Sequence, residues 1–387
     1  MDISIKTALK DLKKGKMVLL VDDVAPKKQA FLILPAESIS EEDICFMVNY
    51  ARGTIWAAID ENHLAYLGLG MMPLSDNSGA FDFTVSVEAR KGVTTGISAA
   101  DRAQTLRILA TSMRPKQDLV TPGHIFPIRS RCGGVLVRNA PAEAANDLLN
   151  LISARPITAM AQCLNQHGDF IDEQHINQLL KDHKMHSVYI SDIIRYRLST
   201  EPIVELIAQA KLPTRNAGMF EAHCFRSLTD DAEHLALVRG VVKQDATDQG
   251  IILVRVQSET QYADLLGADS SYGRSRLKLA MEKIDKNGSG VLVYIRHPRK
   301  GTLSNEVAYS QESLTAAKKP AASPQARSVR TVKHDMNPQL REYGIGAQIL
   351  NSLGVRRVKL LSNSSREITG LDAFHLEIVE REALSAD

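Results

Sequence analysis

Residues 121–138 read TPGHIFPIRSRCGGVLVR, and this stretch, together with two others, decides the fold of the first half of the chain. The second stretch is GVTTGISAADR at 92–102, and the third joins VDD at 21–23 to ILPAE at 33–37. Taken singly, TTG and CGG are explained equally well as tight turns. Taken together, the three stretches form a specific pattern for one domain.

Short β-rich runs alternate with helical stretches around these three segments, which indicates an α+β or α/β fold. Apolar runs at 17–21 and 31–34 predict strands. Helices are predicted at 41–50, 98–111, 141–152, 175–184 and 190–197. The first domain is therefore expected to end near residue 200.

The second half of the chain contains three nearly continuous apolar runs that are typical of buried strands. They are GIILVRV at 250–256, GVLVYIR at 290–296 and VKLLSN at 358–363. Helices predicted at 275–286 and 345–353 lie between them in sequence and are expected to cover the sheet. This half is therefore predicted to be a second α/β unit.

The chain length of 387 residues favours two domains, which we place at 1–200 and 201–387. Between residues 310 and 332 the composition changes to Ala, Lys, Pro, Ser and Arg, with almost no apolar side chain to bury. Such a segment is typical of a flexible insert inside the second domain.

The composition excludes a general affinity for nucleic acid or for a membrane surface. Hydrophobic residues make up 44% and charged residues 24%, and the formal net charge is only +2. The N-terminus reads as an amphipathic helix with Ile5, Leu9 and Leu12 on one face, followed by an apolar run too short to span a bilayer. We therefore expect neither a signal peptide nor a membrane anchor.

The four cysteines are far apart in sequence and include no CxxC pair. They are Cys45, Cys132, Cys163 and Cys224. This spacing argues against a disulfide framework and against a zinc knuckle. A reducing, cytoplasmic location is expected.

The three stretches of the first half resemble 3,4-dihydroxy-2-butanone-4-phosphate synthase, over roughly residues 5–200. The resemblance implies an α+β enzyme that converts ribulose 5-phosphate to a four-carbon phosphate and formate, with magnesium or manganese as cofactor. Glycine-rich turns bring backbone N–H groups close to a phosphate, and Arg and Thr side chains add further donors. The residues that the resemblance leaves for holding a phosphorylated ligand are Asp22, Thr94, Thr95, Asp101 and Arg138.

These surviving residues also have a purely structural interpretation. Asp101 and Arg102 are adjacent and would form an internal ion pair. His124, between a glycine and an isoleucine, would be a buried, hydrogen-bonded histidine. Residues that serve the fold persist after chemistry is lost, so both interpretations stay open.

Several chemically demanding positions of the synthase family have changed. The family's acidic loop EDRENEGD here reads VAPKKQAF, with Lys27 at the metal-binding Glu and Phe31 at a substrate-binding Asp. The metal-binding His has become Pro141, and the essential Glu has become Gln162, an amide that cannot act as a general base. His124 is retained. A cation at position 27 is expected to repel a divalent metal.

The second half resembles GTP cyclohydrolase II, the partner domain of the synthase in bifunctional riboflavin biosynthesis proteins. The resemblance rests on AKLPTRNAGMFEAHCF at 210–225, RVQSE at 255–259 and REYGIGAQILNSLGVRRVKLLSN at 341–363. It implies a zinc ion bound by three cysteines, which activates the water that opens the guanine ring. The order of the two domains is also that of the bifunctional proteins.

All three zinc ligands of that family are replaced here, at Thr260, Ser270 and Tyr272. His223 and Cys224 are the remaining residues that could approach such a site in three dimensions, but a catalytic zinc requires three protein ligands. No metal or other cofactor is therefore expected in either domain.

The nucleotide-handling positions of the second half are partly retained. The family's proton-accepting Asp aligns with Gln339, whereas the Arg two residues further on is kept as Arg341. Arg255, Glu259 and Arg341 would bind an anionic ligand or, alternatively, form salt bridges at strand ends.

Three functional hypotheses follow from these observations. The first is a pseudoenzyme, inactive in both domains, that binds a phosphorylated small molecule or pairs with an active riboflavin-pathway enzyme, as a homodimer and without nucleic acid or membrane. The second is an enzyme with residual or altered synthase-type activity on ribulose 5-phosphate or a related sugar phosphate, using His124, Asp101 and Arg138. The third is a purely structural dimer.

Overall fold

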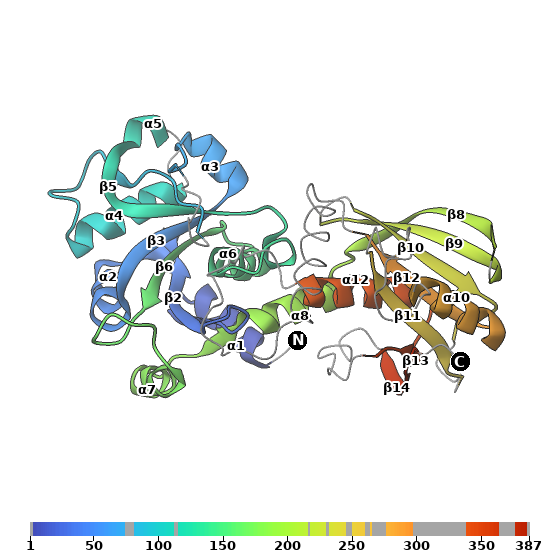
Figure 1. The fold of residues 1–387 in the computed structure, drawn as a ribbon. Helices are drawn as coiled ribbons and strands as arrows, with labels where there is room; N and C mark the ends of the chain where they lie inside the picture. The colour runs from blue at the N-terminus through green and yellow to red at the C-terminus, as the bar shows by residue number, and fades with distance from the viewer. Residues whose placement is uncertain are drawn as a thin grey trace, which may run out of the picture. The chain divides into compact units, whose positions relative to one another are not determined.

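The computed structural model describes residues 3–73, 81–111, 115–215, 217–229, 232–244, 250–259, 264, 276–296, 338–363 and 376–384. These residues form two compact units that divide between Arg197 and Leu198. Each unit contains one seven-stranded sheet with helices packed on it (Figure 1). The insert predicted at 310–332 lies outside the described residues.

The sheet of the first unit has the order β4-β5-β3-β6-β2-β1-β7. Its strands are β1 Val18–Asp22, β2 Gln29–Pro35, β3 Arg52–Asp60, β4 Val87–Ala89, β5 Leu119–Ser130, β6 Ile157–Cys163 and β7 Ser187–Tyr189. Two neighbouring pairs, β3 with β5 and β1 with β7, are parallel, and the others are antiparallel. The mixed sheet confirms the predicted combination of α and β structure.

Most helices of the first unit follow the predicted segments: α1 Ile3–Lys13, α2 Glu41–Phe46, α4 Ala99–Thr111, α6 Pro141–Leu151, α7 Glu173–His183 and α8 Ile190–Thr200, whose last residues belong to the second unit. The short helices α3 Glu61–Leu67 and α5 Pro115–Asp118 were not predicted. The single helix predicted at 41–50 is two segments, because α2 continues as a π-helix over Met47–Ala51 and ends at Arg52 with a left-handed φ of 67°.

Helix α6 is deeply buried and packs against β3, β5 and β6. It begins at Pro141, whose fixed φ suits the first helical position and whose missing N–H is not needed there. Residues 141–149 are all buried, including Glu143, Asn146 and Asp147. Those three polar side chains must find partners inside the unit.

The sheet of the second unit has the order β14-β13-β11-β12-β10-β9-β8. Its strands are β8 Val204–Thr214, β9 Gly218–Ser227, β10 Glu233–Arg239, β11 Ile252–Ser258, β12 Gly290–Ile295, β13 Arg357–Leu361 and β14 Glu377–Glu382. The strands β11 to β14 pair in parallel, which confirms the three predicted buried strands, and β8 to β10 add an antiparallel part.

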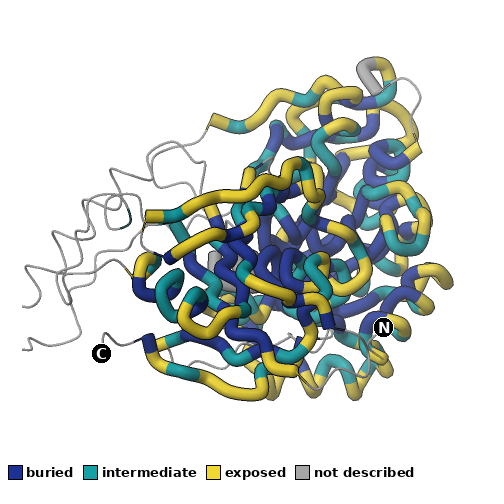
Figure 2. The backbone as a smooth tube through the Cα atoms, turned by 90° about the vertical axis from the view of Figure 1, so that its right-hand side faces the viewer, coloured by how far each residue is buried: buried dark blue, intermediate teal, exposed yellow. Residues whose placement is uncertain are grey.

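Two helices pack on the second sheet: α10, Arg276–Asn287, and α12, Pro338–Ser352. Leu253 of β11 lies in the core under α10, whereas Val256 lies against Gly346 of α12. Residues three apart in a strand point to opposite faces, so the two helices cover opposite faces of the sheet. Figure 2 shows the buried stretches of the backbone in the interior and the exposed stretches mostly along the outside.

None of the helices in the described part of the chain is long and apolar enough to cross a membrane.

Candidate functional site

Asp22 stands at the end of β1, where the loop that the resemblance expects to be acidic begins. Its side chain is buried, and Oδ1 accepts hydrogen bonds from the backbone N–H groups of Val24 and Ala25 at 3.1 and 3.0 Å. Oδ2 is buried and has no hydrogen-bond partner among the residues that the structure describes. Burial raises the pKa of Asp22 to about 6, although the two backbone hydrogen bonds act in the opposite direction. Asp22 therefore shapes the loop with one oxygen and keeps the other unsatisfied.

The two lysines of this loop are held by residues near α7. The Lys27 ammonium lies 5.0 Å from the centroid of the Phe170 ring, a cation–π distance. Lys28 Nζ lies 3.5 Å from Glu173 Oε2. A cation thus occupies the position at which the resemblance expects a metal-binding carboxylate.

Phe31 belongs to a group of four aromatic rings that the sequence analysis did not anticipate. It is fully buried in β2, with its ring centroid 5.9 Å from that of Trp56 on β3. Phe81 and Phe83 lie 4.9 and 5.2 Å from Trp56. The one feature of the sequence that could have indicated this cluster is Trp56, the only tryptophan in the chain. This aromatic cluster puts the buried phenyl ring of Phe31, which offers a sugar or phosphate no hydrogen bond, where the resemblance expects a substrate-binding carboxylate.

Gln162 on β6 faces the same region of the sheet. It pairs with Phe31 across β2 and β6, and its Nε2 donates to Gln29 Oε1 at 2.8 Å. The side-chain amide of Gln162 is therefore hydrogen-bonded to that of Gln29. An amide does not accept a proton at any working pH, so Gln162 cannot act as a general base.

Asp101 organises the loop that contains TTG. Its carboxylate accepts from the Thr94 N–H at 3.0 Å, the Thr94 hydroxyl at 2.8 Å and the Gly96 N–H at 2.9 Å. Burial opposes ionisation, but these hydrogen bonds outweigh it and lower the pKa of Asp101. The ion pair with Arg102 was the wrong alternative, because Asp101 is bonded to its own loop. The Thr95 side chain is exposed beside it.

His124 on β5 meets this loop through Glu88 of β4, a residue that the sequence analysis missed. His124 Nδ1 lies 3.2 Å from Glu88 Oε2, and the side chains are 41% and 14% exposed. A Cβ atom at Gly96 would collide with the Glu88 carboxylate, so that carboxylate lies directly against the loop. His124 is therefore hydrogen-bonded as expected but is not buried.

Arg138 is buried just before α6 and is fully engaged with carboxylates of its own unit. Its Nη1 lies 3.3 Å from Asp82 Oδ2 and 3.5 Å from Glu143 Oε1. Burial raises the pKa of Glu143 to about 7, although Arg138 acts in the opposite direction. The structure thus separates Arg138, inside the unit, from the exposed surface at His124 and Thr95.

The first unit does not fit the divalent metal that the resemblance implies. The family's metal positions carry Lys27 and Pro141, and neither side chain offers a ligand for a hard cation. Among the described residues, no three His, Cys, Asp or Glu side chains gather closely enough to hold a metal ion.

The retained residues of the second unit make local contacts. Arg255 Nη1 donates to the Leu361 carbonyl at 2.8 Å and Nη2 to Gln257 Oε1 at 2.6 Å. Glu259 Oε1 lies 3.8 Å from Arg296 Nε. The contact of Glu259 agrees with the alternative of a salt bridge at a strand end, whereas these two contacts of Arg255 are hydrogen bonds to uncharged groups.

Several second-unit predictions cannot be placed by the structure. Thr260, Ser270 and Tyr272 lie outside the described residues, and so do the side chains of Gln339 and Arg341, whose backbone belongs to α12. His223 and Cys224 are neighbours on β9 and therefore point to opposite faces, which prevents them from sharing a ligand.

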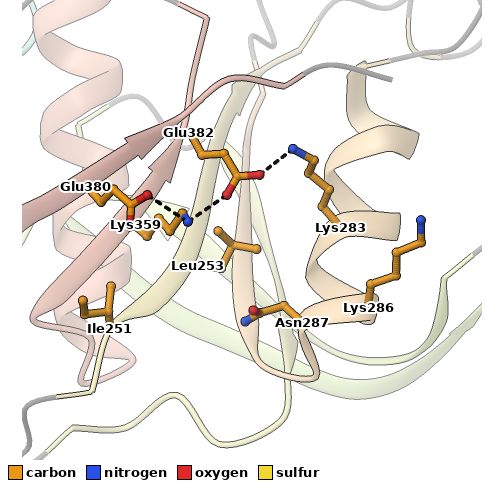
Figure 3. Close-up of a pocket in the computed structure, with 8 residues that line it drawn as sticks. All are labelled: Ile251, Leu253, Lys283, Lys286, Asn287, Lys359, Glu380 and Glu382. Carbon is orange, nitrogen blue, oxygen red and sulfur yellow. Dashed lines mark hydrogen bonds and ion pairs between the residues drawn. The ribbon is translucent and has the colours of Figure 1, made fainter. Parts of the chain in front are cut away.

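A cavity of about 370 Å³ opens between α10 and the edge formed by β13 and β14 (Figure 3). Lys359 Nζ lies 3.0 Å from both Glu380 Oε1 and Glu382 Oε2, and Lys283 Nζ lies 2.5 Å from Glu382 Oε1. Leu253 lines the floor, so the cavity lies toward the start of β11, away from Glu259. Its charges largely neutralise one another.

Comparison with known proteins assigns a relative to each unit. A family model for 3,4-dihydroxy-2-butanone 4-phosphate synthase matches residues 6–196, and one for GTP cyclohydrolase II matches residues 205–383. The riboflavin biosynthesis protein RibBA of Aquifex aeolicus (strain VF5) is 36% identical, over 98% of this chain and 91% of its own length. The monofunctional chloroplastic riboflavin biosynthesis protein RIBA 2 of Arabidopsis thaliana is 38% identical, over 97% of this chain and 75% of its own length.

A solved structure is similar over the whole chain. It is RibBX from A. baumannii, described as a two-domain 3,4-dihydroxy-2-butanone 4-phosphate synthase. It is 29% identical in sequence, with a TM-score of 0.77 and coverage of 99% of both chains. The two-domain architecture is therefore shared along the full length.

Proposed function

The chain belongs to the family of two-domain riboflavin biosynthesis proteins that join 3,4-dihydroxy-2-butanone 4-phosphate synthase to GTP cyclohydrolase II, and we propose that it catalyses neither reaction. It acts instead as a binding, regulatory or scaffolding protein of that pathway. The proposed form is a cytoplasmic homodimer. Its proposed partners are a phosphorylated small molecule and an active enzyme of the same pathway.

One observation carries this proposal. The side chains at the positions where the resemblance expects catalytic or metal-binding groups in the first unit instead contact other residues of the same unit. Lys27 lies on the Phe170 ring, Phe31 lies in the aromatic cluster, and Gln162 is bonded to Gln29. A cation, a phenyl ring and an amide supply neither a metal ligand nor a general base. The family's chemistry requires both.

Ligand binding remains compatible with these replacements. The Thr95 side chain on the loop held by Asp101 is exposed, and so is His124 on β5, whereas the Thr94 hydroxyl is bonded to Asp101. Such groups bind a phosphorylated compound by hydrogen bonds without converting it. For the second unit, the proposal of lost zinc rests on Thr260, Ser270 and Tyr272 in the sequence.

A second candidate function is a synthase-type activity on a sugar phosphate, and one observation favours it. The exposed His124 is oriented by the half-buried Glu88 carboxylate, and a histidine oriented by a carboxylate is a competent general base. Asp101 serves this candidate only indirectly, since its carboxylate holds the loop.

An assay for formate separates the two candidates. The purified chain is incubated with ribulose 5-phosphate and magnesium, and then with GTP and zinc, beside an active two-domain relative as positive control. We expect no formate from either substrate. Turnover comparable with that of the relative would refute the first candidate, and its loss in His124→Ala, but not in Cys132→Ser, would establish the second.

A further inference from the structure

Three arginines of one short segment converge on a single carboxylate oxygen in the first unit. Asp82 Oδ2 lies 2.9 Å from Arg129 Nη2, 3.3 Å from Arg138 Nη1 and 3.9 Å from Arg131 Nη2. Guanidinium groups bind carboxylate and phosphate oxygens with the same donor geometry. Three of them around one point form the arrangement of an anion subsite.

The backbone fixes Asp82 in this position. The Arg129 N–H donates to the Asp82 carbonyl at 2.9 Å, and the next residue, Phe83, forms a β-bridge with Ile128. The rings of Phe81 and Phe83, on either side, belong to the aromatic cluster with Trp56. Asp82 is therefore held by main-chain pairing and by its packed neighbours as well as by its charge.

The charges of the group are balanced within the chain. Besides Asp82, the Glu61 carboxylate lies 3.5 Å from Arg129, and Glu143 lies 3.5 Å from Arg138. Burial alone would raise the pKa of Asp82, but Arg129, Arg138 and Arg131 outweigh it and lower that pKa. Asp82 is accordingly an anion at neutral pH, and neutralising it leaves an excess of positive charge around its side chain.

We propose that Arg129, Arg131 and Arg138 form an anion subsite whose occupant is Asp82 of the same chain. The subsite is thus closed to a free phosphate group by an internal carboxylate that takes its place. Neutralising Asp82 opens the subsite to an oxyanion such as inorganic phosphate. The inference goes beyond the proposed function, because it concerns a group of arginines separate from Thr95 and His124 and is tested without any turnover.

The test is a calorimetric titration with inorganic phosphate of five proteins: the wild type, Asp82→Asn, Arg138→Gln, the double variant that combines these two changes, and Glu61→Gln. We expect Asp82→Asn to bind phosphate about tenfold or more tightly than the wild type, and the double variant to lose this gain. Glu61→Gln removes the same amount of charge from the cluster but leaves the Asp82 carboxylate in place, and is expected to behave as the wild type.

Two results would overturn the proposal. In the first, the wild type binds phosphate as tightly as Asp82→Asn does, and the Arg138→Gln variant does not bind it. The other is a folded Asp82→Asn protein, checked by near-UV circular dichroism, with no gain in phosphate affinity. Asp82→Ser serves as the second variant where the asparagine protein does not fold. The wild-type titration decides in every case, because Arg138-dependent binding by the wild type contradicts a closed subsite.

Discussion

Two acidic side chains of the first unit are buried with one oxygen unsatisfied. They are Asp22 and Glu143, whose Oδ2 and Oε2 atoms have no hydrogen-bond partner among the described residues. Burial raises both pKa values, to about 6 and about 7. Both groups therefore take up protons more readily in the folded chain than in the unfolded one. Stability that depends on them is greatest in acid and declines toward neutral pH.

We predict that Glu143→Gln flattens this pH dependence. The folded pKa of Glu143 is raised from 4.5 to about 7, so its contribution is fully present below pH 4.5 and is lost as the pH rises through 7. Urea unfolding measured at pH 4.5 and at pH 7 should show that the free energy of unfolding of the wild type falls by roughly 3 kcal/mol relative to that of the variant. The exposed Glu37→Gln serves as control and should follow the wild type. Parallel curves for the wild type and Glu143→Gln would contradict the prediction.

At the scale of elements, the loop 94–98 depends on the first turn of α4. Asp101 in that turn accepts three hydrogen bonds from Thr94 and Gly96, and its own N–H donates to the Ser98 hydroxyl at 3.1 Å. Gly96 has a φ of +82° and lies against Glu88, so no larger residue fits there. One carboxylate thus ties the loop to the helix.

We predict that Asp101→Ala frees the loop and destabilises the first unit by about 3 kcal/mol, because three charge-assisted hydrogen bonds are lost. Ser98→Ala removes only the cap of the helix and should cost about 1 kcal/mol. Hydrogen exchange should show the Thr94 and Gly96 amides losing protection in Asp101→Ala alone. Equal protection in the two variants would show that the loop is held by other contacts.

At the scale of the whole molecule, each unit has its own hydrophobic core. The first core includes Leu32, Ile59 and Leu106, and the second includes Phe220, Leu253 and Leu292. Separate cores permit the two units to unfold independently, since burial is the main source of stability in each.

We predict two thermal unfolding transitions, one for each unit, and each should respond only to substitutions in the core of its own unit. Phe31→Ala should cost about 3–5 kcal/mol and lower only the transition of the first unit, and Phe220→Ala should lower only the other. Differential scanning calorimetry of the two variants makes the comparison, and each variant is the control for the other. A single transition lowered equally by both would show that the units unfold as one.

The sequence determined the two-domain organisation, most of the helices and the family of each half. Long apolar runs at 250–256 and 290–296 sufficed for strands β11 and β12, because a fully buried strand leaves a continuous signal. The residues that replace the family's acidic positions, such as Lys27 and Gln162, were also visible directly in the sequence.

Only the tertiary structure decided what those residues do. Glu88 meets His124 because β4 pairs with β5, and Asp82 meets Arg138 although 56 residues separate them in the chain. The aromatic cluster joins rings from β2, β3 and the segment after residue 80. Such contacts depend on strand order and register, which local propensity does not contain. The sequence therefore determined which residues stand at the positions that the resemblance assigns to chemistry, and strand pairing decided which side chains those residues meet.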